Sequence, residues 1–231
     1  MNRPIQLLIR SLVATLFVGM AGQLPASIVT TPTDLNPGDE YRLVFLTSGT
    51  RSALSTSIDD YNFFVKSLGD VAVVSDWKAI ASTATVDAID NTGTTGGGGV
   101  PIYNLVDQLV AEDYDDLWDG SILNSIHIDE NGSSSYQVVW TGTGVAGAAI
   151  PDYFMGSGGN AINGSPYYKH DDWVSAGDIF TVGSYLRMYG MSSVLTVPTE
   201  PVPEPASVIT WTLLGIVGCI GTWWNRRRKA G

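Results

Sequence analysis

The segment around residue 170 contains the side chains best suited to chemistry. His170 is followed by Asp171 and Asp172, and an imidazole beside carboxylates is the pairing that a general base needs. The surrounding residues are polar, so we interpret the segment as a solvated loop. A secreted hydrolase that uses Asp171 and Asp172 is the alternative. The second histidine, His127, lies in no catalytic motif, and the sequence has no G-x-S-x-G, H-E-x-x-H, Walker or dinucleotide-binding pattern. We therefore predict a protein that is not an enzyme.

Three aromatic residues flank the same segment, namely Tyr167, Tyr168 and Trp173. Aromatic rings beside the polar side chains of an exported loop suit stacking on a carbohydrate. The same rings could instead fix a long loop to the core of the domain. The sequence therefore offers a candidate glycan-binding site, with a structural role for these rings as the alternative.

Carboxylates are concentrated in two stretches, EDYDD at 112–116 and DEN at 129–131. Calcium takes six to eight oxygen ligands, often from such loops. The glycine and glutamate that an EF-hand loop needs at its sixth and twelfth positions are missing, so we favour helix capping and solvated charge. No other cofactor is expected. The ligands of a weak calcium site would come from Asp113, Asp115, Asp116, Asp119 and Asp129.

The charge balance of the chain narrows the choice of partners. The 231 residues carry a net charge of −11, but residues 27–200 hold only six basic residues against 22 acidic ones, a net charge of −16. So acidic a surface repels phosphate groups, which excludes nucleic acid and anionic lipid as partners. The single cysteine, Cys219, lies outside this stretch, so the domain has no internal disulfide.

The pattern of apolar residues predicts strands separated by long loops and one clear helix at Ser55–Asp70. Ser57 is placed to cap this helix and Gly69 to end it, with one apolar face that covers a sheet. We expect a mixed α/β (α+β), loop-rich domain. Strands are predicted at 41–48, 76–82, 101–105, 135–143 and 191–198, a helical turn at 113–120, and loops at 92–99 and 146–166.

Four phrases occur in an order that resembles the C-type-lectin-like fold of the endostatin domain of collagens. They are WKAIAS at 77–82, VPIYNLVDQLVAEDYDDLWDG at 100–120, VVWTGTGVAG at 138–147 and SSVLTV at 192–197. Endostatin-like domains carry disulfides, a basic heparin-binding face and an N-terminal histidine zinc site. This chain has no cysteine there, few bases and no histidine before His127. The resemblance therefore implies a lectin-like scaffold and none of those functions.

The two ends of the chain are typical of export. Residues 1–26 read as a signal peptide, with Arg3 and Arg10 before an apolar core and cleavage after Ala21 or Ala26; a retained anchor is the alternative. Residues 27–197 then form the exported domain and 198–205 a proline-rich linker. Residues 206–224 are uncharged and span about 28 Å as a helix. A basic cytoplasmic tail at 225–231 would orient the domain outward.

The C-terminal 30 residues closely resemble the PEP-CTERM sorting signal. The motif Val202-Pro203-Glu204-Pro205 precedes the apolar helix, and Arg226, Arg227 and Arg228 follow it. In that family the signal is read by exosortase, a membrane enzyme of Gram-negative bacteria that produce exopolysaccharide. The resemblance implies signal peptidase and exosortase as processing partners and an inner-membrane intermediate. Delivery to the cell surface or extracellular matrix would follow, in contact with extracellular polysaccharide; a permanent single-pass anchor is the alternative.

Overall fold

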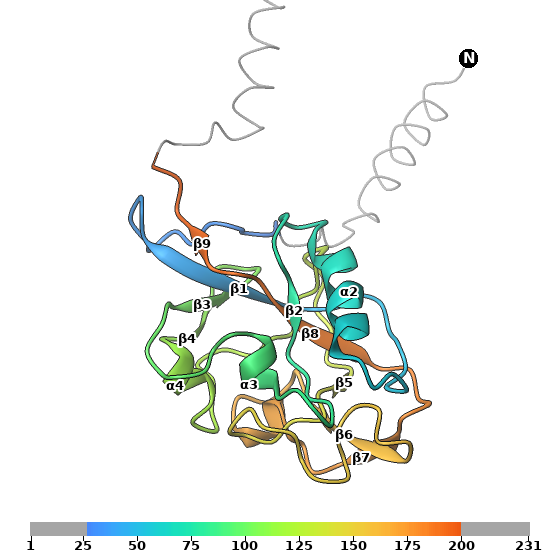
Figure 1. Ribbon diagram of the computed structural model, residues 1–231. Coiled ribbons are helices and arrows are strands. Elements are labelled where there is room, and N and C mark those ends of the chain that lie inside the picture. Colours follow the sequence, from blue (N-terminus) through green and yellow to red (C-terminus); the bar gives the residue numbers. More distant parts are fainter. Residues whose placement is uncertain (1–26, 200–231) are drawn as a thin grey trace, which may run out of the picture.

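The computed structural model describes residues 27–199, which form one mixed sheet of nine strands with few, short helices, an α+β arrangement (Figure 1). Within this range no helix has the length and apolar character needed to cross a bilayer. The predicted signal peptide, the motif at 202–205, the transmembrane helix at 206–224 and the basic tail lie outside the described residues. They remain predictions.

The strands of the sheet lie in the order β4-β3-β1-β8-β5-β6-β7, with β2 also paired to β8 and β9 to β1. Most neighbours are antiparallel, but β1 runs parallel to β3 and β5 runs parallel to β8. In Figure 1, β3 and β4 therefore lie at one end of the domain and β6 and β7 at the other. The elements are β1 (Glu40–Leu46), α2 (Ile58–Gly69), β2 (Lys78–Ala79), α3 (Ala88–Asn91), β3 (Ile102–Asn104), β4 (Leu109–Ala111), α4 (Tyr114–Leu117), β5 (Val139–Trp140), β6 (Asn160–Gly164), the 3₁₀ turn η1 (Asp171–Trp173), β7 (Ile179–Thr181), β8 (Arg187–Met191) and β9 (Leu195–Thr196).

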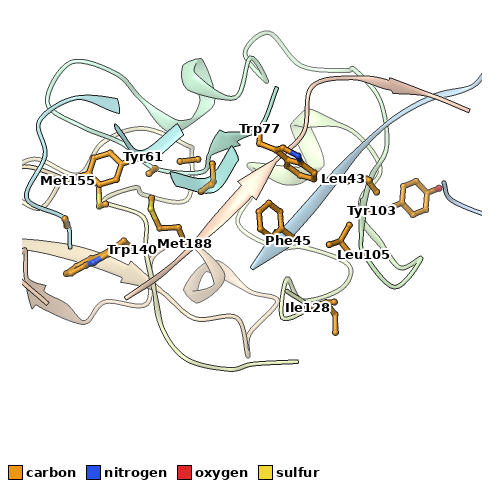
Figure 2. Close-up of a cluster of buried hydrophobic side chains, with 14 of the residues drawn as sticks. Leu43, Phe45, Tyr61, Trp77, Tyr103, Leu105, Ile128, Trp140, Met155 and Met188 are labelled. Carbon is orange, nitrogen blue, oxygen red and sulfur yellow. The ribbon is translucent and has the colours of Figure 1, made fainter. Parts of the chain in front are cut away.

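The central strand β1 supplies side chains to two separate hydrophobic clusters. Successive residues of a strand point to opposite faces of the sheet, so Leu43 and Phe45 enter one cluster while Val44 and Leu46 enter the other. In the first cluster Phe45 meets the Trp77 ring edge-on at 4.8 Å between centroids, and Figure 2 shows these rings together. The sheet is therefore covered on both faces.

The helix α2 confirms the predicted amphipathic segment and covers the first cluster with Tyr61 and Val65. One detail differs from the prediction: Ser57 occupies the N-cap position but its side chain makes no capping hydrogen bond. The helix ends at Gly69 as predicted. A Cβ at this position would lie 2.7 Å from the Trp77 ring. The glycine lets the end of the helix approach that ring.

The predicted strand at 135–143 is wrong in extent, because only Val139 and Trp140 pair with neighbouring strands. Residues 135–137 are not buried and lie beside the sheet. Beyond Trp140 the backbone turns at Gly142, whose φ of +62° favours glycine. The strand therefore shrinks to the two residues that lie between β8 and β6.

The predicted surface loop at 146–166 is also wrong in part, since it contains the buried strand β6. Small residues hide this strand from a pattern search, yet they allow its close packing: a Cβ at Gly164 would lie 2.3 Å from the carbonyl oxygen of Trp173. The predicted strand at 191–198 divides in a similar way. Its first residue ends β8, and β9 begins only at Leu195, because the Ser192 hydroxyl accepts a hydrogen bond from the Leu43 amide between the two.

Candidate functional site

Five aromatic rings touch one another in a continuous line on the surface, and we call this group the aromatic strip. His127 stacks on Tyr136 with centroids 5.3 Å apart and planes 8° from parallel. Tyr136 meets Tyr167 at 5.7 Å and Tyr167 meets Tyr168 at 5.1 Å, both edge-to-face. Tyr168 lies 4.7 Å from His170, which ends the line. Two loops that are distant in sequence thus build one surface feature.

Backbone hydrogen bonds hold these loops in place. The Ser135 amide donates to the His127 carbonyl at 2.8 Å, which closes the loop that carries the first two rings. The segment with the other three is tied at both ends. The Ser165 amide donates to the Asp172 carbonyl at 2.9 Å, and the Ile122 amide donates to the Lys169 carbonyl at 2.6 Å. The rings are therefore presented by a fixed backbone.

The tyrosines of the strip are open to solvent, with exposed fractions of 54% for Tyr136, 62% for Tyr167 and 40% for Tyr168. A contiguous apolar patch on a protein surface usually marks an interaction site. Aromatic rings offer flat apolar faces, and tyrosine adds a hydroxyl that forms hydrogen bonds at the rim of a contact. These properties suit a ligand that is apolar on its faces and polar at its edges, as a sugar ring is.

Trp173 was expected beside Tyr167 and Tyr168, but it lies inside the domain with no exposed surface. Its ring lies in the second hydrophobic cluster, 5.8 Å from Trp118 and 5.9 Å from Tyr189. The turn η1 directs it inward, because the Trp173 amide bonds back to the His170 carbonyl at 2.8 Å. The structural role that the sequence left open therefore applies to Trp173, whereas Tyr167 and Tyr168 lie on the surface.

Tyr189 completes this buried group. Its hydroxyl donates to the carbonyl of Trp173 at 3.2 Å. Complete burial raises the pKa of Tyr189 well above its usual value, because the phenolate would lose its hydration. In the first cluster, burial likewise raises the pKa of Tyr61 to about 12. Both phenols are therefore neutral parts of the core.

The residues first considered for catalysis do meet in space. His170 Nδ1 lies 2.9 Å from Asp171 Oδ1 and 3.7 Å from Asp172 Oδ2. Among residues 27–199 these three form the one group of histidine and acidic side chains whose potential ligand atoms lie within 4.8 Å of one another. His170 and Asp171 are exposed, which agrees with the predicted solvated segment. The group lies at the end of the aromatic strip.

The five aspartates proposed as calcium ligands are occupied locally and do not meet at one point. Asp113 caps α4 by accepting the Asp116 amide at 2.9 Å, and Asp116 accepts the Glu112 amide at 2.7 Å. The other three likewise accept backbone amides: Asp115 from Gly98, Asp119 from Ser121, and Asp129 from Asn131 and Ser133. The capping interpretation is confirmed for Asp113.

Two rings of the strip, Tyr136 and His127, were missed as site residues by the sequence analysis. Tyr136 stood inside a predicted strand, where a tyrosine is an ordinary core residue, and His127 stood in no motif. The one usable signal was the polar run that precedes Tyr136, Ser133 to Ser135, which is unusual for a buried strand. Only the fold brings this loop to Tyr167.

A pocket of about 360 Å³ borders the segment that carries Tyr136 of the strip. Gln137, the residue after Tyr136, forms one wall, and Arg187 at the start of β8 forms another. The Arg187 Nε donates to Gln137 Oε1 at 3.0 Å and its Nη1 donates to the Thr47 carbonyl at 2.6 Å. The complete lining is Thr50, Gln137, Val138, Tyr185, Leu186 and Arg187.

Comparison with known proteins assigns the chain to no family: neither a protein-family model nor a curated protein matches it. The aromatic strip, the pocket that borders the Tyr136 segment and the two chain ends are therefore the features that bear on function.

Proposed function

We propose that this is an exported, non-enzymatic protein of the cell surface or extracellular matrix that binds polysaccharide through the aromatic strip. The observation that carries this proposal is the line of contacting rings from His127 to His170, in which three tyrosines remain open to solvent. Rings that served only the core would be buried, as Trp77 and Trp140 are. A continuous line of exposed rings fits a chain of sugar units better than a compact ligand.

The α+β architecture and the long loops are compatible with the C-type-lectin-like scaffold that the sequence resembles. In such a scaffold the sheet supplies rigidity and the loops supply the ligand contacts. The residues of the aromatic strip all lie outside the helices and named strands, with His170 at the N-cap position of η1, which agrees with this division. The sequence resemblance supports a binding module and does not specify the ligand.

The cellular location of the protein is proposed from the sequences of its two ends. A signal peptide at 1–26 and the sequence from Val202 to Arg228 support export, followed by exosortase-type processing near Pro203-Glu204-Pro205. The intact mass of the mature protein isolated from its source tests this directly. Loss of both ends is expected, and a mature C-terminus that retains Arg226 to Arg228 would instead support the permanent anchor.

Polysaccharide binding is testable by affinity electrophoresis of the full-length protein in detergent, with a soluble neutral β-glucan in the gel. A neutral polymer is the appropriate probe because residues 27–200 carry a net charge of −16 and repel polyanions. We expect retardation that disappears in the double variant Tyr167→Ala/Tyr168→Ala. The control Phe63→Ala removes a ring outside the strip that is more exposed than either tyrosine, at 75%. Equal retardation of all three proteins would refute the proposal.

A hydrolase remains the second candidate, supported by the 2.9 Å contact between His170 and Asp171. This arrangement could activate a water molecule for attack on a glycosidic bond. Release of reducing sugar from the same β-glucan separates the two candidates. Turnover that is abolished by Asp171→Ala and Asp172→Ala would establish the enzyme, whereas retardation without turnover supports the binding module.

A further inference from the structure

Four of the six cations of this acidic domain pair with a carboxylate or an aromatic ring. Lys66 and Lys78 form ion pairs with aspartates at 2.9 and 3.3 Å. Arg42 lies over the ring of Tyr114, and Arg51 lies over two rings of the first cluster. Within residues 27–199, only Lys169 and Arg187 have neither a carboxylate nor an aromatic ring as partner.

Of these two cations, Arg187 alone lines the pocket that borders the Tyr136 segment. Its Nε and Nη1 donate to Gln137 and to the Thr47 carbonyl, which fix the guanidinium group in position. Its Nη2 donates to no other group in the part of the chain that the structure describes. The buried carboxylate of Glu130 accepts from Ser48 and Asn131 and forms no ion pair with Arg187. A positioned guanidinium with donors to spare is a receptor for a carboxylate.

The location of the pocket connects it with the strip. Gln137, which holds Arg187, directly follows Tyr136, the second ring of the line. Tyr185 stands in the pocket wall with 71% of its surface exposed, so it adds an open aromatic ring beside the cation. A volume of about 360 Å³ is within the range of small-ligand sites and suits a single sugar unit.

We propose that this pocket binds one uronic acid unit of a glycan whose neighbouring units lie along the aromatic strip. The inference rests on the proposed polysaccharide binding and adds its specificity. The uronate carboxylate accepts from Arg187, and Tyr185 packs against the sugar ring. The net charge of −16 would repel a polyuronate, which carries many negative charges. A single carboxylate that contacts Arg187 directly is governed by this short-range attraction, because salt screens the more distant charges. The ligand class is therefore a mainly neutral glycan with occasional uronate units.

The test compares two probes on the full-length protein by isothermal titration calorimetry. One is a neutral β-gluco-tetrasaccharide, and the other is the same tetrasaccharide with one terminal glucuronate. The natural protein is expected to bind the uronate probe about tenfold more tightly, which corresponds to one well-placed charged contact. Arg187→Gln is expected to reduce that ratio to about one. Lys169→Gln, which removes the other uncommitted cation, should leave the ratio unchanged.

A second variant guards against misfolding of Arg187→Gln, since Arg187 also bonds to the main chain of Thr47. Gln137→Glu keeps the contact to Nε but places a carboxylate against the guanidinium group, so the pocket cation is neutralised while its position is retained. Loss of the tenfold ratio in this variant is expected. Equal affinity of the natural protein for both probes would overturn the uronate pocket but leave polysaccharide binding intact. Binding of neither probe would overturn both proposals.

Discussion

Two lines of aromatic contacts lie close together in this protein, one buried and one exposed. The buried line runs from Trp118 through Trp173 to Tyr189, and the exposed line is the aromatic strip. One segment, 165–173, contributes to both, because Tyr167 and Tyr168 point outward and Trp173 points inward. Similar ring-to-ring distances therefore serve different purposes: the buried line stabilises the domain, and the exposed line is available to a ligand.

If the strip binds glycan as proposed, exposure and not residue type separates the rings that stabilise the domain from those that bind a ligand. A buried ring contributes through the area that it removes from water and through close packing. An exposed ring leaves most of its apolar surface in contact with water, where a partner can cover it. Variants on either side of this division should therefore change either the free energy of unfolding or ligand affinity, and seldom both.

The largest effect is expected from Trp173→Ala, which breaks the buried line. Removal of this fully buried ring leaves a cavity against Trp118 and Tyr189. The free energy of unfolding should fall by about 3–5 kcal/mol. Urea unfolding followed by tryptophan fluorescence measures the change. A loss below about 1 kcal/mol would show that Trp173 does not belong to a packed core.

The next effect in size is expected from Gly164→Ala. The added Cβ would lie 2.3 Å from the Trp173 carbonyl oxygen, so β6 and η1 must move apart. Because the obstacle is main chain and cannot rotate away, we expect a loss of about 1–3 kcal/mol in the free energy of unfolding. Gly159→Ala is the matched control, since nothing lies within 4 Å of a Cβ there. An equal loss in both variants would contradict the close packing.

The exposed line is broken by the double variant Tyr167→Ala/Tyr168→Ala. Glycan affinity should fall at least tenfold, about 1.4 kcal/mol, while the midpoint of urea unfolding stays close to that of the natural protein because both rings are exposed. Titration calorimetry and urea unfolding of the same preparation give both values. A large shift of the midpoint without a change in affinity would reverse the roles assigned to the two lines.

The smallest effect is expected from Tyr189→Phe, which removes only the hydrogen bond to the Trp173 carbonyl. The cost at pH 7 should be about 1 kcal/mol. Burial raises the pKa of Tyr189 in the folded state. The protonated hydroxyl therefore contributes fully to the free energy of unfolding below the pKa of about 10 that it has in the unfolded chain. That contribution is lost as the pH rises above this value. We therefore measure the free energy of unfolding in urea at pH 8 and at pH 11. It should fall less between these two pH values in the variant than in the natural protein.

Local patterns predicted the regular elements that make mostly local or strongly apolar contacts. The helix α2 and the strand β1 were found from periodicity, and helix capping was predicted for the acidic stretch at 112–116 that contains Asp113. The strands β5 and β6 were misjudged. Their limits depend on partners far away in the sequence, such as the Trp173 carbonyl that fits only against Gly164.

One repeated tripeptide shows the same limit directly. Asn131-Gly132-Ser133 and Asn163-Gly164-Ser165 are identical in sequence. Asn131 is exposed in a turn stabilised by Asp129, whereas Asn163 has no exposed surface and lies in β6. The same three residues therefore lie in opposite environments. Their burial is decided by the strands that surround them and not by the tripeptide itself.

The sequence by itself determined the acidic charge balance, the class of mixed α and β elements, and the patterns at both ends that indicate export. These properties are totals over the residues or local patterns along the chain, so they can be derived without knowing which distant segments contact one another. Only the tertiary structure decided which aromatic rings form a surface. It separated Trp173 from Tyr167 and Tyr168, brought Tyr136 and His127 beside them, and placed Arg187 in the pocket that borders the Tyr136 segment, because each of these placements depends on packing between segments that are distant along the chain.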